Sequence, residues 1–191
     1  MKFPETNNKI VCIVATGYAW DDCVFGNSNK DYWTLNNMYH TNVSPESFDE
    51  WFQLHRPGSH EGHIDDEPMR TFLATKWKKP CWVQKDWGAE LQVLNPYVYP
   101  IDEVIKEYCP KDVNGISYPY FTNSVDYMIC LALLRGYEEL HLHGVEFISP
   151  VDDEYFKMRQ SINFYLGQAM KMDRKVVIQP TSSMLRSDFW Y

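Results

Sequence analysis

The sequence predicts an α/β fold built on a mainly parallel sheet with helices packed against it. One observation is residues 9–15, KIVCIVA, an uninterrupted apolar run rich in β-branched side chains, as expected of a strand buried on both faces. A second is residues 121–147, where a capped helix, a glycine stop and a short apolar strand follow one another. The third is that helical and strand patterns alternate through the remaining chain.

The helix within residues 121–147 carries its own start and stop signals. Asn123 is a good N-cap, Asp126 stands three residues later as in a capping box, and Gly136 is placed to end the helix. The strand that follows is expected to end at residues 144–146. Ligands of parallel α/β sheets bind outside the carboxyl ends of strands, so Glu146 and residues 122–124 become candidate site residues.

The other elements are predicted from apolar periodicity and from turn residues. The expected strands are 31–37, 48–55, 80–84, 175–179 and, as a strand or an edge, 91–94. The expected helices are 71–74, 101–108 and 152–172. Prolines make residues 95–100 rigid and extended, and residues 110–119 are expected to form a loop. No repeat or linker interrupts residues 1–191, which are expected to form a single domain.

Two further segments bear on function. Residues 56–68 are the longest polar stretch and form a loop, interpreted as a lid over the site. Histidines and aspartates cluster there, but their spacing matches no closed zinc pattern, so solvated side chains are favoured over a metal site. Residues 186–191 end in Phe-Trp-Tyr, an aromatic tail that would dock on its own chain or on a second subunit.

Composition excludes some classes of protein. The net charge of -8 and the pI near 5.2 argue against a surface that follows a nucleic-acid backbone, although a small anionic ligand remains compatible. The five cysteines form no CxxC pair, so we expect thiols buried as small apolar groups in a reducing compartment. No signal peptide or membrane-spanning run is apparent, which predicts a cytoplasmic protein without membrane partners.

Two strand ends carry residue types that suit contact with a ligand. The first strand runs into residues 16–22, TGYAWDD, a glycine turn and polar helix start of the kind that holds phosphate or ribose. The single glycine makes neither a GxGxxG motif nor a P-loop, and an ordinary turn is the favoured alternative. Asn36 and Asn37 end the second strand, where they would form a turn or offer hydrogen bonds to a ligand.

Five stretches of the chain carry a resemblance to a known family. They are IVATGYAW, WTLNNMY, FDEWFQLH, residues 121–147 and residues 155–185. Together they resemble the small Rossmann-like proteins of tailed bacteriophages, which are similar to the 6-hydroxymethylpterin pyrophosphokinase-like and motility-associated glycosyltransferase-like family. The resemblance implies a three-layer Rossmann-like fold. The chain departs from the family pattern at Tyr18 and Ala19, where a serine is common, at Glu146, where an aspartate is common, and at His141 and His143.

The resemblance also implies a pocket for a nucleotide or a nucleotide sugar. Its wall would consist of Gly17, Tyr18, Trp20, Asp21, Asn36, His55, Thr122, Asn123, Ser124 and Glu146. Amides at Gly17 and at the start of the helix capped by Asn123 would hold phosphate oxygens. Trp20 or Tyr18 would stack on a base, and Asn36 would bind a ribose or a base. The alternative for each residue is a purely local role, as a turn, a cap or a surface carboxylate.

Two residues are the candidate catalytic groups. Glu146 would bind Mg²⁺ or act as a general base, and His55 would act as an acid or as a donor to developing charge. No tightly bound organic cofactor is expected.

The implied function is transfer of a phosphoryl, pyrophosphoryl or glycosyl group in the cytoplasm, that of the host for a phage protein. Two alternatives remain open: a non-catalytic protein that sequesters a nucleotide signal, and a structural or interaction protein of the virion. The aromatic tail leaves a homo-oligomer open as well.

Overall fold

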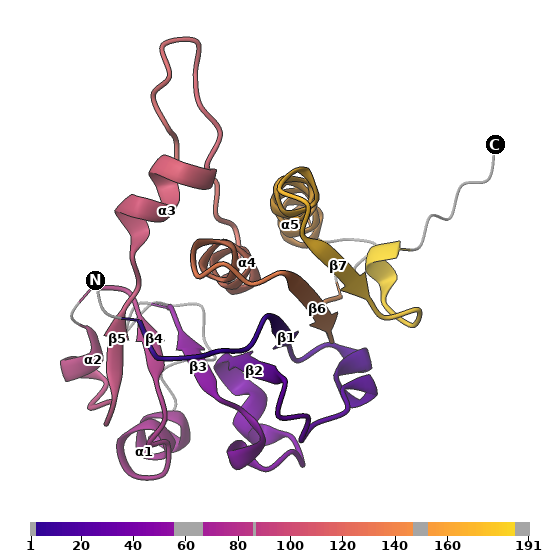
Figure 1. Cartoon of the computed structure of the whole chain (residues 1–191). Helices are drawn as coiled ribbons and strands as arrows, with labels where there is room; N and C mark the ends of the chain where they lie inside the picture. Colours follow the sequence, from indigo (N-terminus) through magenta and orange to yellow (C-terminus); the bar gives the residue numbers. More distant parts are fainter. Residues whose placement is uncertain (1–2, 56–66, 86, 147–152, 186–191) are drawn as a thin grey trace.

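A single seven-stranded sheet forms the centre of the computed structural model, which describes residues 3–55, 67–85, 87–146 and 153–185 (Figure 1). The strands are β1 (Ile10–Val14), β2 (Lys30–Leu35), β3 (Glu50–Gln53), β4 (Cys81–Val83), β5 (Pro96–Val98), β6 (Glu139–His143) and β7 (Lys175–Ile178). Their order is β5-β4-β3-β2-β1-β6-β7, and every pair is parallel. Strands β2 to β5 are therefore added in turn on one side of β1, and β6 and β7 on its other side, so the strand order reverses between β1 and β6.

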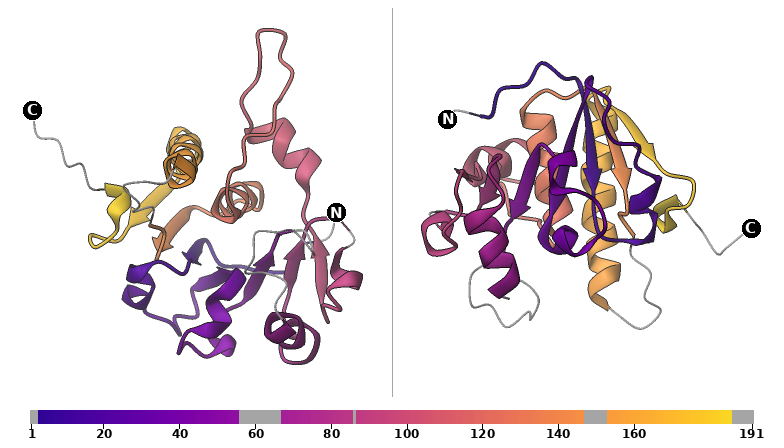
Figure 2. Two further views of the ribbon diagram at one scale, coloured as in Figure 1. Left: turned by 180° about the vertical axis from the view of Figure 1, so that it is seen from behind. Right: turned by 90° about the horizontal axis from the view of Figure 1, so that it is seen from below.

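Helices cover both faces of this sheet (Figures 1 and 2). One face carries α3 (Ile101–Tyr108), α4 (Ser124–Leu134) and α5 (Asp153–Lys171). The other face carries α1 (Glu67–Thr75), the short α2 (Trp87–Glu90) and the 3-10 turns η1 (Tyr18–Asp22), η2 (Asn36–His40) and η3 (Pro45–Ser47), whereas η4 (Ser183–Leu185) follows β7. The predicted three-layer α/β architecture with a Rossmann-like parallel sheet is thereby confirmed. None of the helices in the described ranges is both long and apolar enough to cross a membrane.

Most predicted elements are confirmed, with shifted ends. β1, α3, α4, α5 and β7 lie where the patterns predict them. β2 stops before Asn36 because that residue takes a left-handed conformation, with φ 45, and begins η2. β3 is shorter than residues 48–55, and α1 is longer than residues 71–74.

Three local predictions are wrong. Residues 91–94 form no strand; Leu91 and Val93 are buried in the loop after α2, so their apolar pattern reflects packing. The edge strand is instead Pro96–Val98, within the segment expected to be only extended. The polar helix expected at residues 16–22 is the five-residue 3-10 turn η1. Of the loop predicted over residues 56–68, residues 67 and 68 instead begin α1, and residues 56–66 lie outside the described residues. The tail predicted over residues 186–191 also lies outside them.

The two sides of the sheet bury separate apolar clusters. Alternate residues of β1 divide between them: Val11 and Ile13 pack under α4, whereas Cys12 and Val14 face the side of α1. Both sets are almost fully buried, as expected of a central parallel strand. The five cysteines are free and buried, as the composition predicts.

A buried ion pair ties α4 to the amino edge of the sheet. Arg135, just after α4, lies 2.6 Å from Glu50 at the start of β3, with side chains only 3% and 5% exposed. Trp82 donates to the second carboxylate oxygen of Glu50 at 2.5 Å, and the Arg135 guanidinium lies 5.1 Å from the centre of the Trp33 ring. Burial raises the pKa of Glu50, and the charge of Arg135 opposes that rise. A buried carboxylate with its cation and both oxygens engaged is the stable form of such a pair.

Removing only the cation is therefore expected to destabilise the fold strongly. Arg135→Met should lower the free energy of unfolding by about 3–5 kcal/mol, because it leaves Glu50 buried without a counter-charge. The double variant Glu50→Gln with Arg135→Met should lose clearly less, since the remaining amide is neutral and still accepts from Trp82. Urea denaturation at neutral pH measures both values. Equal losses would show that Glu50 carries no buried charge.

The turn after β1 and the turn after β6 touch through two glycines. Gly17 donates its N–H to the carbonyl of Gly144 at 2.8 Å, continuing the bond from Ala15 to His143. A Cβ on Gly17 would overlap that carbonyl oxygen and come within 3.1 Å of the Glu146 side chain. Gly144 has a positive φ of 62, and a Cβ there would meet Trp20 at 2.9 Å. Glycine is thus required at both positions, and the β1–β6 crevice is filled by backbone.

Substitution of one glycine by alanine tests this close contact. Gly17→Ala should lower the free energy of unfolding by about 1–3 kcal/mol, as overpacking does, because the residue has an ordinary φ and only the contact is perturbed. Gly167→Ala is the matched control: this exposed α5 residue has open space for a Cβ, so stability should rise by about 0.5–1 kcal/mol. Thermal and urea unfolding measure whether each variant is less or more stable than the unsubstituted protein. A neutral Gly17→Ala variant would contradict the contact.

Candidate functional site

The predicted site residues lie along the carboxyl edge of the sheet. Gly17, Tyr18, Trp20 and Asp21 follow β1, Asn36 follows β2, His55 follows β3 and Glu146 follows β6, while Thr122, Asn123 and Ser124 form the start of α4. Since α4 runs antiparallel to the strands, its first residues meet their carboxyl ends. Three smaller groups form within this row: the His55 centre, the glycine turn with Glu146, and the α4 cap.

The His55 centre consists of His55, Asn36 and Ser124. The Nε2 atom of His55 lies 3.4 Å from the Asn36 amide nitrogen and 3.4 Å from the Ser124 hydroxyl. Because an amide nitrogen can only donate, the first contact requires an unprotonated Nε2. The Oδ1 atom of Asn36 is buried without a hydrogen-bond partner. The fold thus brings together three polar side chains from separate segments and leaves one of their acceptors unused.

The glycine turn holds a carboxylate of the chain itself. The Tyr18 N–H donates to Glu146 Oε2 at 2.9 Å, and the N–H of Gly17 is already bonded to Gly144. Nearby, Asp22 accepts from the Thr181 hydroxyl at 2.5 Å, which ties η1 to the segment after β7. The Gly17 amide, on which a phosphate was predicted to bind, and the neighbouring Tyr18 amide are therefore both engaged within the protein. The Tyr18 side chain is 88% exposed and available to stack.

The start of α4 is capped by its own side chains. Asn123 Oδ1 accepts from the N–H groups of Val125 at 2.9 Å and Asp126 at 3.2 Å, as the N-cap prediction requires. Asp126 accepts in return from the Thr122 N–H at 2.9 Å and from the Ser161 hydroxyl at 2.7 Å. These bonds complete the predicted capping motif and engage two amides that would otherwise face a ligand.

Two further amide side chains keep buried atoms without partners: Asn37, which the sequence predicted to form a turn or to contact a ligand, and Gln53, which it did not single out. Gln53, the last residue of β3, has both side-chain polar atoms buried without partners, and so does Asn37 with its Oδ1 atom. Gln53 is a polar residue directly after two apolar residues of β3, and this position is the only sign in the sequence that its side chain could contact a ligand. Buried polar atoms without partners are uncommon and often mark ligand contacts.

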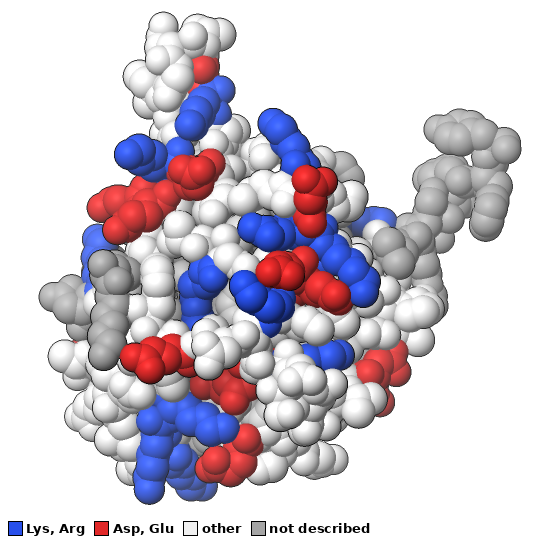
Figure 3. Space-filling view, in the orientation of Figure 1, with Lys and Arg blue, Asp and Glu red and all other residues white. Residues whose placement is uncertain are grey.

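The charge around the molecule is mixed. In Figure 3 the basic and acidic side chains alternate over the visible face, and no broad basic surface gathers there. The described surface has two hollows. One, of about 880 Å³, involves Asp31 and Arg135 at the amino edge, and one of about 630 Å³ lies between Tyr39 and α1. Neither contains a predicted site residue.

Comparisons with known proteins add no family assignment. The chain matches no family model, and searches against curated proteins and solved structures give no significant match. The resemblance to phage Rossmann-like proteins, the nucleotide ligand and Mg²⁺ therefore stay predictions.

The α4 cap predicts a specific pH dependence of stability. Burial raises the pKa of Asp126 from 3.8 to about 6, against the opposing hydrogen bonds from Thr122, Ser161 and Asn123. Between these values the unfolded chain has lost the proton and the folded chain keeps it, so stability falls as the pH rises. The expected loss from this group is about 3 kcal/mol, complete above about pH 6.

Asp126→Asn should remove this dependence. Urea denaturation from about pH 4 to pH 7 should show the free energy of unfolding of the variant gaining about 3 kcal/mol relative to the unsubstituted protein. Asp112→Asn is the control, because hydrogen bonds from the Ile116 and Asn114 N–H groups lower the pKa of that exposed carboxyl and give the opposite sign. A difference between Asp126→Asn and the unsubstituted protein that does not change with pH would contradict the assignment.

Proposed function

We propose that this chain binds a nucleotide or a nucleotide sugar at the carboxyl edge of its sheet and holds it without transferring a group. The His55 centre carries the proposal. The Asn36 amide nitrogen and the Ser124 hydroxyl each lie 3.4 Å from His55 Nε2, and the buried Asn36 Oδ1 has no partner. Such a set suits the hydroxyl groups of a ribose or sugar and the edge of a base, which donate and accept hydrogen bonds.

The engaged amides favour binding over group transfer. Phosphoryl transfer depends on donors and cations aimed at the charge of the transferring group. The N–H groups of Gly17 and Tyr18 donate to Gly144 and Glu146, and Asn123 caps the next two free amides of α4. In addition η1 is a short 3-10 turn, which lacks the macrodipole of a long helix.

Phosphates on the ligand would meet an acidic rim. Glu146 is half-buried beside the glycine turn, and the exposed Asp21 and Asp22 follow in η1. A divalent cation between these carboxylates and a phosphate would offset the repulsion, and Mg²⁺ prefers such a set of oxygen ligands. We therefore expect nucleotides to bind in a Mg²⁺-dependent manner and nucleosides to bind without it.

A nucleotide-dependent transferase is the second candidate. One observation favours it: the Tyr18 N–H fixes the Glu146 carboxylate at the rim, where it could act as a general base or hold Mg²⁺.

Calorimetry with ATP, GTP, CTP, UTP, their nucleosides and UDP-glucose, each with and without Mg²⁺, tests the proposal. His55→Ala and Ser124→Ala should each weaken the binding of the best ligand about 10-fold, the equivalent of one lost hydrogen bond. His141→Ala is the matched control, since His141 lies within β6 and contacts Glu139. Binding that is unaffected by His55→Ala and Ser124→Ala would contradict the site.

Mass spectrometry of the recovered ligand separates the two candidates. An intact ligand after long incubation agrees with the binding protein, whereas a shortened or transferred ligand would favour the transferase and should disappear in Glu146→Ala. If none of these compounds binds or raises Tm at millimolar concentration, both candidates are contradicted.

A further inference from the structure

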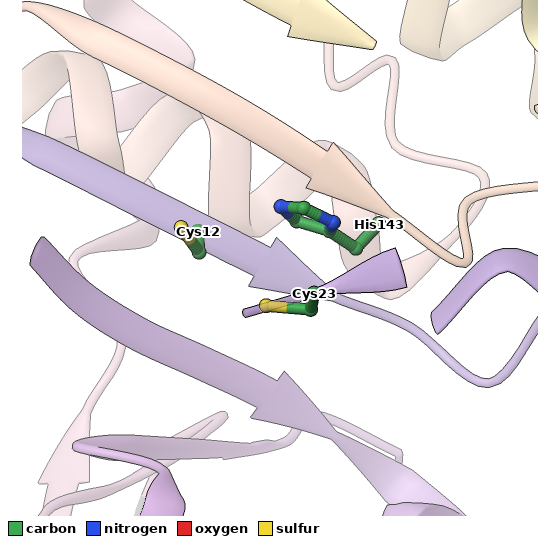
Figure 4. A group of neighbouring side chains, drawn as sticks. All are labelled: Cys12, Cys23 and His143. Atoms are coloured by element: carbon green, nitrogen blue, oxygen red, sulfur yellow. The ribbon is translucent and has the colours of Figure 1, made fainter. Parts of the chain in front are cut away.

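Two cysteines and a histidine meet on the side of the sheet that faces α1. Cys12 lies in β1, Cys23 directly follows η1 and His143 ends β6. Figure 4 shows the three side chains near one another, with the Cys23 sulfur and the His143 ring pointing toward the side of Cys12. One ligand atom from each residue lies within 4.8 Å of the other two. We call these three residues the thiol–imidazole cluster.

The three residues of the thiol–imidazole cluster are buried, and one of their polar atoms has no hydrogen-bond partner. Cys12 is 1% exposed, Cys23 6% and His143 4%. The Nδ1 atom of His143 is buried without a hydrogen-bond partner. Leaving a buried ring nitrogen unpaired costs about 1–3 kcal/mol. Cys12 and Cys23 belong to the buried, mainly apolar cluster that also includes Val14 and Met38.

We propose that the thiol–imidazole cluster binds one thiophilic divalent cation, of the class of Zn²⁺, through Cys12, Cys23 and His143. Thiolate and imidazole are the ligands that Zn²⁺ prefers, and three protein ligands leave a fourth position for water or another ligand. Binding releases the thiol protons to solvent and gives the His143 ring a partner.

Charge balance favours a divalent ion. Two thiolates, one neutral imidazole and one divalent cation sum to zero, which suits an apolar interior where an uncompensated charge is costly. A disulfide between the two cysteines would leave His143 Nδ1 unpaired.

The required movement is small. Metal–sulfur distances of about 2.3 Å and metal–nitrogen distances of about 2.0 Å place tetrahedral ligand atoms roughly 3.5–3.8 Å apart. The observed spacing within 4.8 Å closes to this by a shift of about 1 Å, within the reach of small side-chain rotations. The backbone already holds the cluster in register, because Val14 is paired with His143 and Cys12 with His141.

The bound ion would fasten η1 to the sheet. Cys23 ends the turn whose other end is held by Gly17, so coordination would fix this segment at both ends across β1 and β6. The cluster faces the α1 side and contains no residue of the His55 centre, so metal binding can be tested without a nucleotide.

Cobalt is the probe for the test. We expect reduced, metal-free protein to take up one equivalent of Co²⁺, with the visible bands of tetrahedral Co²⁺ and a thiolate-to-cobalt charge-transfer band of two-thiolate intensity. Zn²⁺ should displace the Co²⁺ and raise Tm. Cys12→Ala, Cys23→Ala and His143→Ala should each weaken Co²⁺ binding by more than about 100-fold, beyond the effect of losing an outer-shell partner.

Cys81→Ala is the matched control, because Cys81 is equally buried in the same apolar cluster but lies in β4, away from the site. It should bind Co²⁺ with unchanged affinity and spectrum. Absence of the charge-transfer band in the reduced unsubstituted protein would overturn the proposal, and this result needs no variant to fold. A mass two hydrogens lower in the unreduced protein would indicate a disulfide. If such protein also took up no Co²⁺ after reduction, the proposal would be overturned as well.

Discussion

The contact between Gly17 and Gly144 fixes the geometry of the carboxyl edge. It draws the turn after β1 onto the end of β6, so that the Tyr18 N–H meets the Glu146 carboxylate. It also fills the crevice where the direction of sheet growth reverses, the place at which open α/β sheets commonly bind ligands. A ligand at this edge must therefore lie beside the crevice, over the ends of β2 and β3, where the His55 centre is found.

The contact between Gly17 and Gly144 also affects the position of Cys23. Beyond Gly17 the chain makes only the short turn η1 before Cys23, which is thus brought over Cys12 and beside His143. A long helix in place of η1 would carry Cys23 away from β1. The absence of a helix between β1 and β2 in the described chain therefore has two consequences: it removes a helix terminus from the phosphate position, and it creates the thiol–imidazole cluster.

Local patterns in the sequence were sufficient for the elements whose signals are local. The apolar run of β1, the Asn123 cap and the stop at Gly136 each lie within a few residues, and all three are observed. β5 was missed because a three-residue edge strand is defined by its pairing with β4, which no local pattern contains. The thiol–imidazole cluster was missed for the same reason: His143 is adjacent to Cys12 only through the pairing of β6 with β1.

The carboxylates at the amino edge of the sheet and the amides at its carboxyl edge differ in their hydrogen bonding. At the amino edge the carboxylates are fully engaged: Asp31 accepts from Thr6, Asn8 and Tyr137, and Glu50 from Arg135 and Trp82. At the carboxyl edge the amides of Asn36, Asn37 and Gln53 keep buried atoms without partners. A satisfied network fixes a fold, whereas an unpaired buried group lowers stability unless something binds it. The stability given up at the carboxyl edge is therefore the strongest physical reason to place a ligand there.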